Sequence, residues 1–147
     1  MTDDRLSILV IEDDHDTRKN LCDILQMDGH QVFSAACFKE SREIAKSNRV
    51  GLVITDRRLP EGMIEDLLID VMADSGDAEV IVVTGLGDMK STIAALRLGV
   101  SDYLIKPVIP DDLRSIVNRI AEKRSLQTRL QHEEAFANEM LNTTEAI

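Results

Sequence analysis

The sequence predicts an α/β fold built on a doubly wound, five-stranded parallel sheet, with strand order 2-1-3-4-5 and an extended C-terminal helix. Short apolar segments alternate with helical patterns along most of the chain. Three of these segments, residues 6–11, 50–55 and 79–84, are nearly continuous runs of Val, Ile and Leu, which is typical of parallel strands covered on both faces. From residue 113 onward no Gly or Pro interrupts the chain, which predicts one long terminal helix.

The elements follow one another as five βα units. Strands are predicted at residues 6–11, 31–35, 50–55, 79–84 and 102–105. Helices are predicted at residues 16–27, 39–47, 63–72 and 89–98, with Gly29 and Gly99 just after the first and the last of them. Right-handed crossovers over such a sheet leave few topologies, and 2-1-3-4-5 is the common order at this length.

The C-terminal segment divides into a covering part and a projecting part. Pro110 suits the first position of a helix, and about a dozen residues are enough to cover the sheet. We therefore expect residues 1–122 to form one domain and residues 123–147 to form a helical linker toward a missing output domain.

The projecting part carries a weak coiled-coil pattern. Its apolar residues follow a 4-3-4-3 spacing if Glu133 fills one seam position; they are Leu126, Leu130, Ala137 and Met140. This pattern predicts a homodimer through the C-terminal helix, and a frayed helical linker explains it equally well.

Composition narrows the function classes. The 147 residues include 17 Lys+Arg against 27 Asp+Glu, and a net charge of -10 would repel a phosphate backbone, so direct nucleic-acid binding is not expected. The two cysteines, Cys22 and Cys37, have no paired spacing, and no apolar run reaches membrane-spanning length. We expect a cytoplasmic protein without membrane contact.

Polar side chains stand where the predicted strands end. Glu12 and Asp13 follow the first strand, and Asp56 follows the third. Thr84 ends the fourth strand and Lys106 follows the fifth. Ligands of open α/β sheets bind at this edge, and strands 1 and 3 are neighbours in the predicted order. Three carboxylates, one hydroxyl and one ammonium group are therefore expected in a single crevice.

This set of groups suits a divalent cation and a phosphoryl group. Carboxylates are the ligands that Mg²⁺ prefers, and Mn²⁺ can substitute for it. A cation among three carboxylates keeps Asp56 ionised, and a carboxylate can attack phosphorus to form an acyl phosphate. The charge on the transferring group is met by the cation, by Lys106 and by Thr84.

Four motifs in order resemble the receiver domain of two-component response regulators, over about residues 5–122. They are Val-Ile-Glu12-Asp13-Asp, Ile-Thr-Asp56-Arg-Arg-Leu-Pro60, Val-Val-Thr84-Gly85 and Tyr103-Leu-Ile-Lys106-Pro107. The resemblance implies a phosphoacceptor signalling domain that is not an enzyme, beyond catalysing its own phosphorylation and dephosphorylation.

The resemblance also implies roles for the acidic residues. Asp56 is expected to be the phosphorylation site, which takes the group from a phosphohistidine of a sensor histidine kinase or histidine phosphotransfer protein. Glu12, Asp13, Asp56 and the backbone carbonyl of Arg58 are expected to hold Mg²⁺. Arg58 and Leu86 stand at positions that affect how water reaches the acyl phosphate.

Further roles fall on the later motifs. Thr84 is expected to move onto the phosphate, Tyr103 to turn inward and Lys106 to pair with a phosphoryl oxygen. The Lys106–Pro107 bond is expected to be cis. Phosphorylation is then expected to switch the face formed by helix 89–98, strand 102–105 and the C-terminal helix.

Three alternatives remain at this point. Phosphoaspartate-type hydrolases use a similar set of groups but carry a second Asp two residues after the nucleophile, where this chain has Arg58. A flavin-binding module needs stacking aromatics, and the chain has 3% aromatic residues and no Trp. A degenerate receiver that serves only as a scaffold would more plausibly have lost Asp56, Thr84 or Lys106.

Overall fold

The computed structural model describes residues 5–85, 87, 90, 94 and 99–145. Its five-stranded parallel sheet has the order β2-β1-β3-β6-β7, which confirms the predicted order 2-1-3-4-5. The strands are β1 (Ser7–Ile11), β2 (Gln31–Ala35), β3 (Leu52–Asp56), β6 (Glu79–Thr84) and β7 (Asp102–Ile105). Each predicted strand is present, because its apolar run is buried in the middle of the fold.

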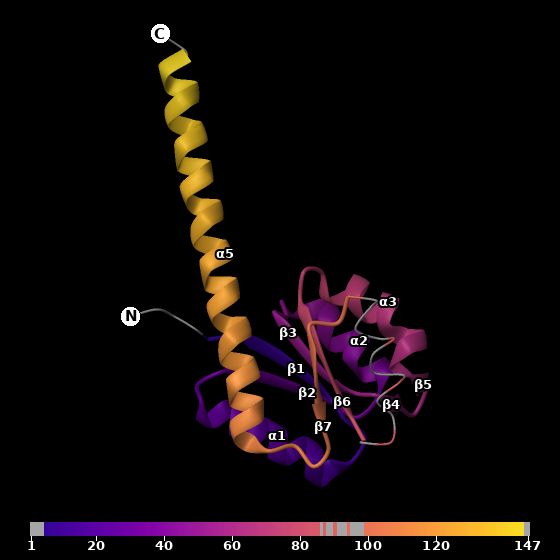
Figure 1. Ribbon diagram of the computed structural model, residues 1–147. Coiled ribbons are helices and arrows are strands. Elements are labelled where there is room, and N and C mark those ends of the chain that lie inside the picture. Colours follow the sequence, from indigo (N-terminus) through magenta and orange to yellow (C-terminus); the bar gives the residue numbers. More distant parts are fainter. Residues whose placement is uncertain (1–4, 86, 88–89, 91–93, 95–98, 146–147) are drawn as a thin grey trace.

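Helices cover both faces of this sheet (Figure 1). They are α1 (His15–Met27), α2 (Phe38–Ser47), α3 (Ile64–Ser75) and α5 (Pro110–Glu145). Side chains of α1 and α5 pack in one core, and those of α2 and α3 pack in another on the opposite face. Most of the predicted helix 89–98 lies outside the described residues, as does Leu86. No helix in the described part of the chain is long and apolar enough to cross a membrane.

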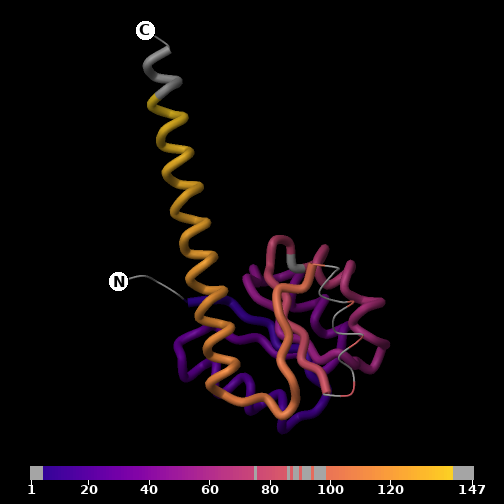
Figure 2. Tube along the Cα trace, viewed as in Figure 1, coloured from indigo at the N-terminus to yellow at the C-terminus, as the bar shows by residue number. Residues whose placement is uncertain are grey.

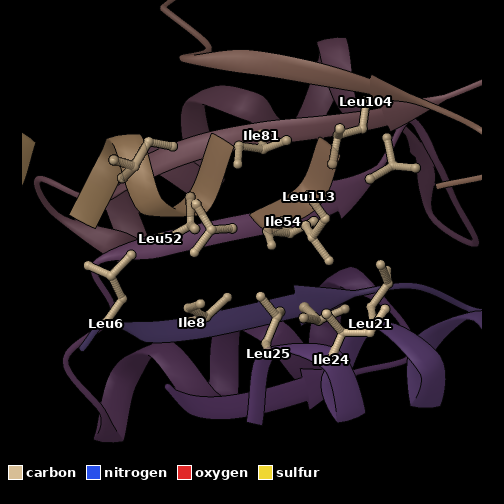
Figure 3. Close-up of a cluster of buried hydrophobic side chains, with 14 of the residues drawn as sticks. Leu6, Ile8, Leu21, Ile24, Leu25, Leu52, Ile54, Ile81, Leu104 and Leu113 are labelled. Carbon is tan, nitrogen blue, oxygen red and sulfur yellow. The ribbon is translucent and has the colours of Figure 1, made fainter. Parts of the chain in front are cut away.

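Successive residues of a strand are buried alternately in one core and in the other. Ile8 and Ile54 point into the core beneath α1 and α5, where they lie near Leu25 and Leu113 (Figure 3). Leu9, the next residue along β1, is buried in the opposite core. Because successive side chains of a strand point to opposite faces, a strand buried on both sides reads as a continuous apolar run.

Helix α5 leaves the domain after its first turns. Its buried residues follow helical spacing and end at Ala121; they are Leu113, Val117, Ile120 and Ala121. Arg124 makes a last contact, in which Nη1 donates to the carbonyl of Asp77 at 2.9 Å. Figure 2 shows the remaining turns extending away from the sheet. The helix has 36 residues, which corresponds to about 54 Å at the usual rise per residue.

A small hairpin follows β3 and was not predicted. β4 (Arg58–Leu59) pairs antiparallel with β5 (Gly62–Met63), and the turn between them contains Glu61. Gly62 has φ +147°, a conformation that side chains with a Cβ rarely adopt. Strands of two residues show no periodicity, so sequence patterns do not reveal them.

Candidate functional site

Glu12 and Asp56 occupy matching ends of two adjacent strands. Ile11 pairs with Thr55 in the β1–β3 ladder, so the residues that follow this pair face each other at the sheet edge. The N–H of Glu12 donates to the carbonyl of Ala35 at 3.0 Å, which continues the β1–β2 ladder past the end of β1. One carboxylate oxygen each from Glu12, Asp13 and Asp56 lies within 4.8 Å of the others. The structure thus brings together the three predicted carboxylates.

Lys106 reaches this acidic cluster from the far side of the sheet edge. Its backbone N–H donates to the carbonyl of Thr84 at 2.8 Å, which places it at the end of the β6–β7 ladder. Its Nζ donates to Asp56 Oδ2 at 3.0 Å and to Glu12 Oε1 at 3.2 Å. The side chain of Lys106 is 36% exposed, whereas those of Glu12 and Asp56 are 3% and 12% exposed. One ammonium group therefore partly neutralises two largely buried carboxylates, and Asp13, the third acid of the cluster, is exposed.

The charges of the cluster shift its pKa values. Burial, reinforced by the hydrogen bond and charge of Asp56, raises the pKa of Glu12 to about 8, although Lys106 acts in the opposite direction. Burial lowers the pKa of Lys106, but the hydrogen bonds and charges of Asp56 and Glu12 outweigh it and leave that pKa raised. Three carboxylates share one ammonium group. The negative charge that remains adds to the effect of burial in raising the pKa of Glu12.

The residues fit a hard divalent cation. Glu12 Oε2 is buried and has no hydrogen-bond partner among the described residues. A buried carboxylate oxygen without a partner is costly unless a cation or a proton meets it. Together with Asp13 and Asp56 it offers the oxygen ligands that Mg²⁺ prefers.

Thr84 and Gly85 lie beside the acidic cluster at the end of β6. Thr84 is 1% exposed. Its hydroxyl donates to the carbonyl of Gly85 at 3.4 Å, a long hydrogen bond. Asp56 is opposite Val83 in the β3–β6 ladder, so Thr84 is the next residue along the neighbouring strand. The hydroxyl is therefore placed near the site and weakly held.

Tyr103 and Pro107 lie along β7 and the loop that follows it. Tyr103 is partly buried and pairs with Val82 in the β6–β7 ladder. It lines a groove together with Lys106, Pro107 and side chains from α5. The Lys106–Pro107 peptide bond is cis, as the resemblance implied.

Two charged residues of the site region escaped sequence reasoning. Arg57 directly follows Asp56, and its Nε donates to Glu65 Oε1 on α3 at 3.1 Å, with only 8% of the arginine side chain exposed. Arg18 Nη1 donates to the carbonyl of Glu12 at 2.8 Å. Arg18 lies in the first turn of α1, where the helix dipole disfavours a positive charge. This unfavourable position was the sequence signal that Arg18 has a partner outside its own helix. A buried partner for Arg57 had no sequence signal, because α3 approaches it only in the folded chain.

Arg58, the fourth predicted cation ligand, opens strand β4. It pairs with Met63 across the hairpin, two residues after Asp56. The N–H of Arg57 donates to the carbonyl of Val83 at 2.9 Å, so the backbone stays attached to β6 as it leaves β3. The hairpin therefore starts from a fixed position next to the acidic cluster.

Known proteins resemble this chain over most of its length. The sequence model of the response regulator receiver domain matches residues 8–118. The C4-dicarboxylate transport transcriptional regulatory protein DctD of Rhizobium meliloti is 34% identical over 122 residues, which cover 82% of this chain and 26% of that protein. The probable transcriptional regulator ycf27 of Porphyridium aerugineum is 32% identical over 126 residues, which cover 80% of this chain and 50% of that protein.

A solved structure shows the same arrangement of elements. The response regulator receiver domain protein from Clostridium thermocellum superposes with a TM-score of 0.75 at 31% identity, and the match covers 83% of this chain and 98% of that one. This chain thus spans at most half the length of the two curated relatives and nearly the whole length of this solved domain.

Proposed function

This chain belongs to the response regulator receiver domain family of two-component systems, and we propose that Asp56 is its phosphorylation site. The family acts in signalling and is not a class of conventional enzymes. The observation that carries the proposal is the contact of Lys106 Nζ with Asp56 Oδ2 at 3.0 Å, within the cluster that also contains Glu12 and Asp13. Lys106 Nζ also contacts Glu12 Oε1 at 3.2 Å, and Asp56 is the more exposed of these two acids, with 12% of its side chain exposed against 3%.

The proposed reaction moves a phosphoryl group from a phosphohistidine to Asp56. A carboxylate oxygen of Asp56 attacks phosphorus, an O–P bond forms, the P–N bond breaks, and the imidazole nitrogen keeps the electron pair. Lys106 meets the charge on the phosphoryl oxygens, and Thr84 supplies a hydroxyl donor once it leaves the carbonyl of Gly85. Mg²⁺, held by Glu12, Asp13, Asp56 and the Arg58 carbonyl, would neutralise the negative charge that gathers on the transferring group; Mn²⁺ can take its place.

The donor and the response complete the proposal. Receiver domains of response regulators interact with histidine kinases, and we take the donor to be a sensor histidine kinase or a histidine phosphotransfer protein. Tyr103 lies with Lys106 and Pro107 in the groove between β7 and α5, which is where a change at Thr84 would reach the surface. The response is a change of this face and of α5.

Beyond its packed turns, α5 is proposed to act as a linker. In this segment, residues 123–147, the described part up to residue 145 extends past Ala121, the last residue of α5 that is buried among those whose burial is described, and it carries the exposed side chains of Leu126 and Leu130. The curated relatives are longer than this chain, which supports a connection to an output domain. The exposed apolar side chains of the projecting helix support pairing of two copies along it. Cys22 and Cys37 form no disulfide, in keeping with a cytoplasmic location.

Two features weigh against the alternatives. A hydrolase of the phosphoaspartate type would need an acid two residues after Asp56, and Arg58 stands there. A degenerate scaffold would not be expected to keep Asp56, Lys106 and Glu12 within contact distance.

The test is covalent labelling with a small phosphodonor. Acetyl phosphate with Mg²⁺ should add one phosphoryl group to the chain, which hydroxylamine removes as it does from other acyl phosphates. Asp56→Asn should take up none. Asp16→Asn is the matched control, because it removes an exposed carboxylate from the same sheet edge and should label like the parent. Equal labelling of Asp56→Asn and the parent would refute the assignment.

A further inference from the structure

The carboxylate of Glu61 caps a helix to which it does not belong. The N–H of Phe38 donates to Glu61 Oε1 at 3.0 Å, and the N–H of Lys39 donates to Oε2 at 2.8 Å. These are the first two residues of α2, whose N-cap residue Cys37 makes no side-chain capping hydrogen bond. A hairpin that follows Asp56 therefore supplies the cap of α2.

This cap uses both oxygens of one ionised group. Backbone N–H groups at a helix N-terminus lack partners within the helix, and the helix dipole favours a negative charge there. Slight burial opposes ionisation of Glu61, but the hydrogen bonds from Lys39 and Phe38 prevail and lower its pKa. Glu61 is otherwise exposed, so these two N–H groups account for its position.

The other end of the same hairpin is attached to the phosphorylation site. Arg58 pairs with Met63 and Leu59 pairs with Gly62, so Glu61 and Arg58 lie on the same small hairpin. The N–H of Ile64 donates to the carbonyl of Arg57 at 2.8 Å, which closes the base of the hairpin. Leu59 is 7% exposed and anchors the hairpin in the core beneath α2 and α3.

We propose that Glu61 is a positioning residue that joins the first turn of α2 to the cation site. By holding the hairpin against α2, it fixes the backbone of Arg58 where its carbonyl serves as a cation ligand. The inference rests on the proposed function, because it takes the cation site from there. Such coupling is reciprocal: if the cap favours cation binding, cation binding stabilises the cap by the same factor.

The test measures both directions of this coupling in the 147-residue chain. Mg²⁺ affinity is obtained by titration, and hydrogen exchange of the Phe38 and Lys39 amides is followed with and without saturating Mg²⁺. In the parent, Mg²⁺ should slow exchange at these two amides. In Glu61→Ala, Mg²⁺ should bind about fivefold more weakly, and it should no longer change their exchange. Glu61→Gln keeps the shape of the side chain and one acceptor oxygen, and it should fall between the two.

A control variant separates the effect of the position of Glu61 from the effect of its negative charge. Asp16→Asn also removes one negative charge at this sheet edge, but the Asp16 side chain is 98% exposed and caps no amide of α2. It should keep the response of Phe38 and Lys39 to Mg²⁺.

The outcomes are distinct. Parent-like Mg²⁺ affinity in Glu61→Ala, or an unchanged response of its two amides, overturns the role of Glu61 and leaves the proposed function standing. If Glu61→Ala is unfolded, Mg²⁺ affinity and amide exchange are measured on Glu61→Gln, and the same two results decide the role of Glu61. A parent chain without saturable Mg²⁺ binding overturns the proposed cation site, and the role of Glu61 with it.

Discussion

The ammonium group of Lys106 lies 3.0 Å from Oδ2 of Asp56, although the two residues are 50 positions apart in the sequence. They stand at the ends of β7 and β3, and β6 lies between these strands. The side chain of Lys106 crosses the end of β6 to reach Asp56, a span of two strand spacings that a long lysine side chain can bridge. It joins the proposed phosphorylation site to the groove beside α5.

Removing this ammonium group should destabilise the chain in the absence of Mg²⁺. Lys106→Met leaves the largely buried Glu12 and Asp56 without their cationic partner. We expect a loss of about 1–2 kcal/mol in the free energy of unfolding, less than for a fully buried pair because Lys106 is partly exposed and Glu12 can take up a proton. Urea denaturation measures the loss. Lys46→Met, which breaks the exposed ion pair with Glu43, is the control and should cost less.

Magnesium should stabilise the folded chain through the acidic cluster. We expect affinity in the low-millimolar range or weaker, because few protein ligands reach the cation. At ten times the dissociation constant, Mg²⁺ should add about 1.4 kcal/mol to the free energy of unfolding. The double variant Glu12→Gln with Asp13→Asn should lose this gain. A thermal shift that is the same in the parent and the double variant would show that Mg²⁺ acts elsewhere.

The ion pair of Arg57 and Glu65 should contribute to stability more than the exposed pairs do. Their side chains are 8% and 22% exposed. Breaking such a pair from one side leaves a charge in a poorly hydrated place, so Arg57→Met and Glu65→Gln should each cost about 2 kcal/mol. A double-mutant cycle should give a coupling energy of about 1 kcal/mol or more. The pair Lys19–Asp23, which is 64% and 51% exposed, should give less than about 0.5 kcal/mol in the same cycle.

His30 should make stability depend on pH below neutrality. It is 8% exposed, and its Nδ1 accepts a hydrogen bond from the N–H of Leu6 at 3.0 Å. Burial lowers its pKa from the ordinary 6.5, although the charge of Asp28 opposes this. The folded state thus binds the proton less readily than the unfolded chain, so the contribution of His30 is complete above pH 6.5 and is lost as the pH falls through the folded pKa.

The measurement is the free energy of unfolding across this pH window. The parent should lose stability relative to His30→Gln as the pH falls below 6.5. The raised pKa of Glu12 acts in the opposite direction, but it acts in both chains and cancels in this difference. His15→Gln should give a curve parallel to that of the parent, because the His15 side chain is 74% exposed. Parallel curves for the parent and His30→Gln would contradict the assignment.

The projecting half of α5 should pair two chains in parallel. Its exposed apolar residues are Leu126 at 50%, Leu130 at 58%, Phe136 at 65% and Met140 at 58%. Sedimentation of the full chain at high concentration should show dimers, and a chain truncated after Lys123 should be monomeric. Leu126→Gln with Leu130→Gln should weaken the dimer, whereas Gln127→Ala should not. Equal monomeric masses for the full and truncated chains, with and without an acyl-phosphate mimic, would make the segment a linker only.

Much of this molecule follows from local sequence. The apolar runs identified every strand of the sheet, because strands covered on both faces need apolar residues at nearly every position. Crossover handedness left few strand orders, and the common one among them was correct. That order predicted that Glu12, Asp13 and Asp56 would meet. Lys106 was placed by the same rule, because it follows a strand that ends at the same edge.

What the sequence did not reveal depends on contacts between segments that have no periodic relation. Glu61 is 23 residues from Phe38, and nothing in the pattern of either segment indicates that one caps the other. The partnership of Arg57 with Glu65 likewise requires the path of the hairpin, which is too short to show a strand pattern. The pattern of apolar residues lies within each segment, so it was enough to predict where the strands run and which polar residues end them. Whether an individual carboxylate makes a hydrogen bond depends on the placement of separate segments to within a few tenths of an ångström, and this placement arises only in the folded chain.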